Sequence, residues 1–153
     1  MQQVFDITQT SRKILAQYLD NYTLAQLNKV PAGFNNNLIW NIAHIIVVQQ
    51  MLVYNLSGLP MMVSPEMVEK YKRGTKPQAD VTQQEIDEIK RLLFETIAHT
   101  KSDFEQNRFA TTAYNTFTTQ MGFTLKTAAE AMQFNYYHEA MHVGMMMGIR
   151  KFV

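Results

Sequence analysis

Cysteine is absent from this chain of 153 residues. Without a thiol of its own, the protein has no disulfide scaffold, no thiolate metal site, no iron–sulfur cluster and no cysteine nucleophile. Apolar residues make up 46% of the chain and charged residues 18%, which is typical of a globular domain and excludes a disordered polymer. The length suits one domain, so we predict a single domain over residues 1–153.

Concentrated charge of one sign is also lacking. The formal net charge is +1, and acidic and basic residues are mixed along the chain. A nucleic-acid or anionic-membrane surface requires clustered Lys and Arg, so we expect no nucleic-acid partner. The nearest approach to a basic patch is Lys70, Lys72, Arg73 and Lys76, which we interpret as solvated side chains of a loop.

The first residues, 1–12, lack the apolar core of a signal peptide, so we expect a cytoplasmic protein. Residues 38–56 are rich in Ile, Val, Leu and Met, but they include Asn41, His44 and Gln49. Polar side chains of this kind are costly in lipid. We therefore predict a buried core helix here and no membrane span.

Helical periodicity dominates the rest of the sequence. Thr82 and Glu85 form a capping box that marks one helix start clearly. The expected helices cover about 3–22, 37–57, 64–70, 82–104 and 124–150, with a long connection over 58–80. We expect a loop, with at most a brief extended piece, over residues 108–123. Long helices without convincing strands predict an all-α bundle, and the long connection permits a crossover.

His138 and His142 are the first candidate metal ligands. Residues four apart in a helix lie on the same face, about 6 Å apart along the axis. Two imidazoles at this spacing can converge on one ion.

His44 lies in the middle of the apolar helix, so its imidazole must be neutral and satisfied by a partner. A structural hydrogen bond is one interpretation, and a third ligand for the His138 and His142 pair is the other. We favour the metal site because a second helix offering one imidazole to such a pair is a standard route to a site in a bundle core. His99, near the end of another helix, is interpreted as structural.

Residues 138–142 also spell HExxH, a zinc-protease motif in which Glu139 would be the general base. The further residues that accompany this motif in zinc proteases are missing here. Only 11 residues follow His142, and the metzincin extension would need Gly and His where Met145 and Gly148 stand. We therefore interpret Glu139 as a polar contact between helices or as a residue behind a metal ligand.

The sequence resembles the DinB-like (DinB/YfiT-like) family. The features that carry the resemblance are residues 41–44 (Asn-Ile-Ala-His), 138–144 (His-Glu-Ala-Met-His-Val-Gly) and the approach to them at 119–123. The resemblance covers nearly the whole chain. It implies a four-helix bundle with one long crossover connection, often dimeric, in which His44, His138 and His142 bind a divalent metal such as zinc or nickel.

Characterised members of that family include transferases that use the thiols bacillithiol or mycothiol, and a maleylpyruvate isomerase. The resemblance thus implies a metal-dependent enzyme in which a metal-activated thiolate or water attacks a small-molecule substrate. Any thiol must come from a cosubstrate, since the chain has none. The alternative is a non-catalytic, dimeric metal- or ligand-binding helical bundle.

Several further residues are open to two readings. Tyr114, Tyr136 and Tyr137 are candidate proton donors, although aromatic residues on helices more often belong to the core. Asn41 is a candidate to orient His44 or a metal-bound ligand, and an internal helix hydrogen bond is equally compatible. Residues 144–148 (Gly-Met-Met-Met-Gly) suit close helix packing or the seam of a homodimer.

Overall fold

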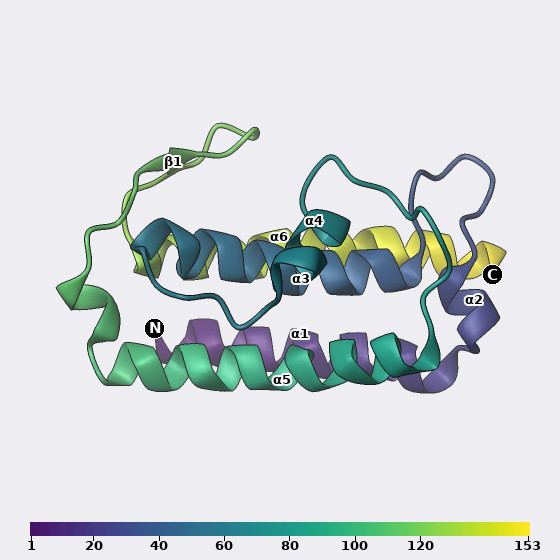
Figure 1. Cartoon of the computed structure of the whole chain (residues 1–153), viewed down its shortest axis with the longest axis horizontal. Coiled ribbons are helices and arrows are strands. Elements are labelled where there is room, and N and C mark those ends of the chain that lie inside the picture. Colours follow the sequence, from purple (N-terminus) through teal and green to yellow (C-terminus); the bar gives the residue numbers. More distant parts are fainter.

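Four long helices lie side by side along the molecule (Figure 1). The computed structural model describes all of residues 1–153, and its long helices are α1 (Gln2–Asn21), α3 (Leu38–Val53), α5 (Gln83–Glu105) and α6 (Ala128–Ile149). Helix α3 packs against α6 and α5, while α1 packs against α5 and α6. The all-α fold that the sequence predicts is confirmed.

Short elements make the connections between the long helices. Thr23 begins α2 (Leu24–Asn28) with a capping box, and the predicted capping box at Thr82 begins α5. The long connection between α3 and α5 contains α4 (Pro65–Tyr71), which starts at the cap Ser64. The remaining helical turns are η1 (Asn55–Ser57), η2 (Arg108–Thr111) and η3 (Arg150–Phe152).

A two-stranded hairpin precedes the last helix. Strand β1 (Phe117–Thr118) pairs in antiparallel fashion with β2 (Thr124–Leu125), and Gly122 has a positive φ of 88° at the turn. The expectation that the last helix opens at residues 122–124 is therefore wrong. Thr127 caps α6 instead, because its side chain accepts the backbone N–H of Glu130, and residues 124 and 125 are held in the hairpin ladder.

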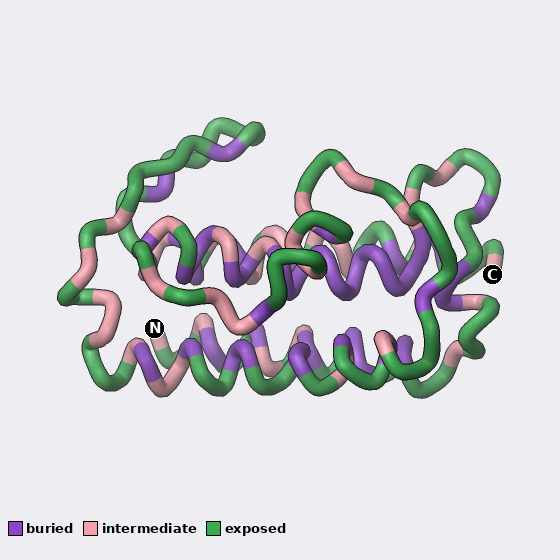
Figure 2. The backbone as a smooth tube through the Cα atoms, in the orientation of Figure 1, coloured by how far each residue is buried: buried purple, intermediate pink, exposed green.

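Helix α3 is the centre of the hydrophobic core. Figure 2 shows burial along nearly all of α3, whereas α5 alternates between buried and exposed turns. By length and composition alone, residues Leu38–Ser57 are apolar enough to cross a membrane, but most of this segment is buried inside the protein. This burial favours the predicted core helix over a membrane span.

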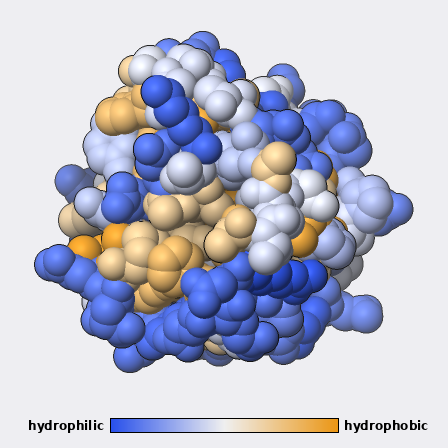
Figure 3. All heavy atoms as spheres, turned by 90° about the vertical axis from the view of Figure 1, so that its left-hand side faces the viewer, coloured by the Kyte–Doolittle hydropathy of each residue, from blue (hydrophilic) through white to orange (hydrophobic).

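A second, smaller core cluster joins the N-terminus of α1 to the C-terminal half of α3 and the start of α6, through residues such as Phe5, Val53 and Met132. Figure 3 views the end of the molecule that lies on the left in Figure 1, and hydrophobic residues are visible at the surface there among hydrophilic ones. Apolar side chains therefore reach solvent at this end of the molecule.

Candidate metal centre

Three imidazoles meet between α3 and α6. His44 comes from α3, and His138 and His142 come from successive turns of α6. One nitrogen from each ring lies within 4.8 Å of the corresponding nitrogens of the other two. The two Nε2 atoms of His138 and His142 are 3.1 Å apart. The structure therefore brings together the three histidines that the sequence analysis selected, and this cluster could hold a metal ion.

Hydrogen bonds from the far side of two rings set their orientation. Nδ1 of His44 lies 2.6 Å from the carbonyl oxygen of Tyr71, at the end of α4. Nδ1 of His142 lies 2.7 Å from Oδ1 of Asn41. Both oxygens only accept hydrogen bonds, so each Nδ1 carries the proton and each Nε2 keeps its lone pair. Such outer contacts fix the tautomer of a metal-ligating histidine.

Asn41 therefore orients His142, across the helix interface, and not its own neighbour His44. Its amide nitrogen donates to the carbonyl oxygen of Asn37, 2.7 Å away, which turns Oδ1 toward His142. The internal helix bond and the orienting bond are both present, so the two interpretations of Asn41 are complementary.

His138 is held differently. Its Nε2 faces His142, but its Nδ1 is buried and has no hydrogen-bond partner. A buried imidazole normally satisfies both ring nitrogens. Three ring nitrogens thus lie close together at one point, and neutral imidazoles suit divalent transition metals.

Burial keeps the three rings neutral. It lowers the pKa of His138 to about 3, assisted by the nearby His142, His44 and Arg12. Burial, with a contribution from His44, lowers the pKa of His142 to about 4. The pKa of His44 is also lowered by burial, against the opposing effect of the Tyr71 carbonyl. Neutral imidazoles are the form that binds metals.

The cluster opens into a pocket of about 320 Å³. Half of its lining residues are apolar: Val48, Met51, Leu52, Phe117, Met121 and Phe134. The hairpin supplies Phe117 and its turn residues Thr119, Gln120 and Met121, so it covers the pocket from one side. The site thus joins three converging imidazoles to a cavity with apolar side chains along half of its lining, which is typical of a small-molecule site.

Glu139 does not line this pocket. It is fully buried, and its Oε1 accepts from Nη2 of Arg12 at 2.7 Å and from Nδ2 of Asn135 at 2.8 Å. The carboxylate thus ties α6 to α1 and is not available as the general base of a protease. The sequence-based interpretation of Glu139 as a polar contact between helices is confirmed.

The other candidates lie outside the cluster. The side chain of His99 is half exposed and lies 3.5 Å from Asp103. The hydroxyl of Tyr114 donates to the carbonyl of Leu52, and burial raises its pKa to about 12. Tyr136 and Tyr137 line a different pocket beside the hairpin. None of the three tyrosines lines the histidine pocket, so the proton-donor interpretation is not supported.

Two contributors to the site were missed by sequence analysis. Trp40 stacks on His44, with ring centroids 4.5 Å apart and an interplanar angle of 13°. Its spacing of four residues from His44 on a helix was a signal that sequence reasoning could have used. The backbone carbonyl of Tyr71 gives no sequence signal, because any residue carries one.

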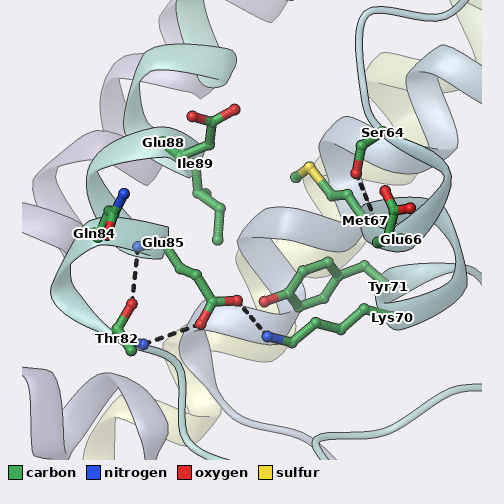
Figure 4. A pocket seen from close by; sticks show the side chains of 10 residues that line it. All are labelled: Ser64, Glu66, Met67, Lys70, Tyr71, Thr82, Gln84, Glu85, Glu88 and Ile89. Atoms are coloured by element: carbon green, nitrogen blue, oxygen red, sulfur yellow. Dashed lines mark hydrogen bonds and ion pairs between the residues drawn. The ribbon is translucent and has the colours of Figure 1, made fainter.

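A larger pocket, of about 510 Å³, lies between α4 and α5 (Figure 4). Its centre is the carboxylate of Glu85, which bonds the ammonium group of Lys70 and the backbone N–H of Thr82. The Lys70 and Glu85 side chains are each about 40% exposed. This pocket is lined by solvated, already paired charges, so the smaller histidine pocket is the better candidate for chemistry.

Comparison with known proteins identifies the fold and the family of the chain. The structure is similar to a crystal structure described as that of a conserved protein from Enterococcus faecalis, with a TM-score of 0.68 and 16% sequence identity over 99% of this chain and 95% of that one. At this identity the likeness shows the fold alone. No curated protein matches the chain. The sequence profile of the DinB superfamily matches residues 7–146, and the chain therefore belongs to the DinB superfamily.

Proposed function

We propose that the protein is a divalent-metal-dependent enzyme that joins a low-molecular-weight thiol to an electrophilic small molecule. The observation that carries the proposal is the convergence of three neutral imidazoles at the base of an apolar pocket. Three protein ligands leave coordination positions open, which is typical of reactive rather than closed structural sites. Zinc or nickel bound there would act as a Lewis acid that lowers the pKa of a thiol or water.

The residues of the chain have distinct roles in this proposal. His44, His138 and His142 would hold the ion. Tyr71, through its carbonyl, and Asn41, through its side chain, keep two of these rings in the tautomer with Nε2 unprotonated. Both contacts lie within the protein, so these two rings are already oriented before a metal ion binds.

The pocket walls determine what can react. Apolar side chains from α3, α6 and the hairpin form half of the pocket lining, which suits the carbon-rich part of an electrophilic acceptor. The thiol comes from a cosubstrate, since the chain contains no cysteine. In the transfer, the thiol gives up its proton, its sulfur bonds to the acceptor carbon, and the leaving group departs with the electron pair. Water in place of the thiol would make the protein a hydrolase.

A screen of thiols against electrophiles tests the proposal. The protein would be loaded with zinc or with nickel and supplied with thiols, bacillithiol and mycothiol among them, and with alkyl or aryl halide acceptors. We expect thiol-dependent turnover that His138→Ala abolishes and that Glu85→Gln, in the other pocket, preserves. Full metal loading without turnover for any thiol or for water would contradict the enzyme proposal.

The second candidate is a dimeric bundle that binds metal or ligand without catalysis. Met145 and Met147 on α6 are 43% and 49% exposed, and Ile14 on α1 is 40% exposed. No atom lies within 4 Å of a Cβ built on Gly144 or Gly148, so these glycines do not serve close packing inside the chain. We propose this face as the seam of a cytoplasmic homodimer. Light scattering tests it: Met147→Lys should yield a monomer if the seam is correct.

A further inference from the structure

Among the side chains that line the histidine pocket, Arg73 is the only Lys, Arg, Asp or Glu, so no carboxylate accompanies it. The histidine cluster supplies three imidazoles to the lining. The remaining polar side chains, Thr119 and Gln120, are uncharged. The pocket is therefore electropositive at one point and apolar along its walls.

Arg73 differs from the paired lysines Lys70 and Lys72 in having no partner, and from the unpaired Lys76 in lining the histidine pocket. Lys70 pairs with Glu85, and Lys72 pairs with Glu69. Arg73 forms no ion pair within the chain, although it belongs to the same short basic segment. Arg73 is exposed, as expected for a solvated segment, and it also lines the pocket that contains the histidines.

The backbone that carries Arg73 is anchored to the site. Its segment follows directly after Tyr71, whose carbonyl accepts from His44. The hydroxyl of Thr75 lies 2.9 Å and 2.8 Å from the carbonyl oxygens of Lys70 and Lys72, and it accepts from Nε1 of Trp40 at 3.2 Å. Arg73 is thus held between two points that both contact the helix bearing His44.

From this placement we propose that Arg73 selects the acceptor: the pocket takes a small molecule with an apolar body and one carboxylate, and Arg73 binds the carboxylate. The inference rests on the proposed function, because it names the substrate class of the same site. A guanidinium presents two parallel N–H donors that match a carboxylate. The apolar walls accommodate the rest of such a molecule, and the lining offers no carboxylate to a cationic substrate.

Equilibrium binding of matched probes tests the proposal without requiring turnover. The probes are 4-phenylbutanoate, its neutral amide and 4-phenylbutylamine, measured by calorimetry on the metal-free protein so that no bound ion competes with Arg73 for the carboxylate. Fluorescence of Trp40, the only tryptophan, reports events beside His44 as a second readout. We expect the carboxylate to bind about tenfold more tightly than the amide, which is the scale of one charged hydrogen-bonded contact at a partly exposed position, and the amine to bind most weakly.

Variants at neighbouring positions separate Arg73 from general electrostatics. Arg73→Gln should remove the preference for the carboxylate, Arg73→Lys should keep part of it, and Lys72→Gln should leave it unchanged. The proposal is overturned if the carboxylate does not bind the wild type, if its preference survives Arg73→Gln, or if Lys72→Gln removes the preference equally. Zinc affinity, measured in parallel, should be the same in all three variants.

The outcomes also distinguish this inference from the proposed function. If no thiol transfer occurs but the Arg73-dependent preference holds, the pocket is a binding site for apolar acids and the inference stands. If transfer occurs, Arg73→Gln should raise the KM of carboxylate-bearing acceptors about tenfold while kcat is kept. Unchanged KM for those acceptors would overturn the role of Arg73 and leave the transferase proposal intact.

Discussion

His138 and Glu139 are adjacent in the sequence, but α6 turns them into different parts of the molecule. His138 points toward α3, where three ring nitrogens lie close together beside a cavity. Glu139 points toward α1, where its Oε1 accepts from Arg12 and Asn135 and its Oε2 is buried without a partner. One face of the helix opens into the pocket, and the other is held to α1 by a buried ion pair. Burial and an unpaired polar atom therefore do not by themselves identify a functional group, whereas a cavity beside converging ligand atoms does.

The largest expected effect is the loss of metal binding when a histidine of the cluster is replaced. His138→Ala removes one of three ligands, so we expect binding of zinc or nickel to fall below detection, as measured by elemental analysis after reconstitution and by calorimetry. His99→Ala, outside the cluster, should bind metal like the wild type. Stoichiometric metal in His138→Ala would contradict the assignment of the site.

The opposite result is expected on the side of α6 that carries Glu139: a substitution there should lower stability and leave metal binding intact. Glu139→Gln leaves the buried charge of Arg12 without its counter-ion, and breaking a buried pair typically costs about 3–5 kcal/mol of unfolding free energy. Metal affinity should be retained, because Glu139 does not line the pocket.

Urea denaturation measures this loss, and the double variant Arg12→Met, Glu139→Leu is its control. Replacing both partners removes the uncompensated charge, so much of the stability should return. A Glu139→Gln protein that is as stable as the wild type but unable to bind metal would reverse the roles assigned to the two faces.

The pH dependence of the folding stability of the metal-free protein should report on the histidines of the cluster. An unfolded histidine has a pKa near 6.5, whereas the folded values are about 3 for His138 and about 4 for His142. Below pH 6.5 the unfolded state binds protons that the folded state does not, so stability falls as the pH decreases toward those folded values. At pH 5 the loss is on the order of 2 kcal/mol per histidine.

Urea denaturation at pH 7 and pH 5 tests this direction. Most carboxylates titrate below pH 5, so they contribute little to the change in stability between these two pH values. His138→Asn should lose less stability between the two pH values than the wild type does, since one of the groups is gone. Equal losses in both proteins would show that His138 does not have the lowered pKa.

Asn41→Ala should produce the smallest of these effects. The substitution removes the oxygen that accepts from Nδ1 of His142 and keeps the three ligands. Loss of an outer hydrogen bond of this kind typically weakens metal affinity 10–100-fold, which competition with a chromogenic chelator would measure. Asn36→Ala is a matched control, since its side chain contacts Asn41 and not a histidine. Unchanged affinity in Asn41→Ala would show that His142 needs no such orientation.

Much of the fold was predictable because it depends on short-range rules. The capping boxes at Thr23 and Thr82 and the buried character of residues 38–53 follow from local sequence. The start of α6 was not predictable in this way, since residues 124 and 125 join a hairpin whose pairing depends on a strand seven residues earlier. Hairpin pairing competes there with helix propensity, and local rules do not weigh the two.

The sequence by itself determined that His138 and His142 share a face of one helix, because four residues make about one helical turn. It also excluded every thiolate ligand. Only the tertiary structure decided that Asn41 reaches His142, 101 residues away, that the carbonyl of Tyr71 reaches His44, 27 residues away, and that Arg73 lines the same pocket. Such contacts arise from the packing of whole helices and connections around a shared core, and no local periodicity encodes them.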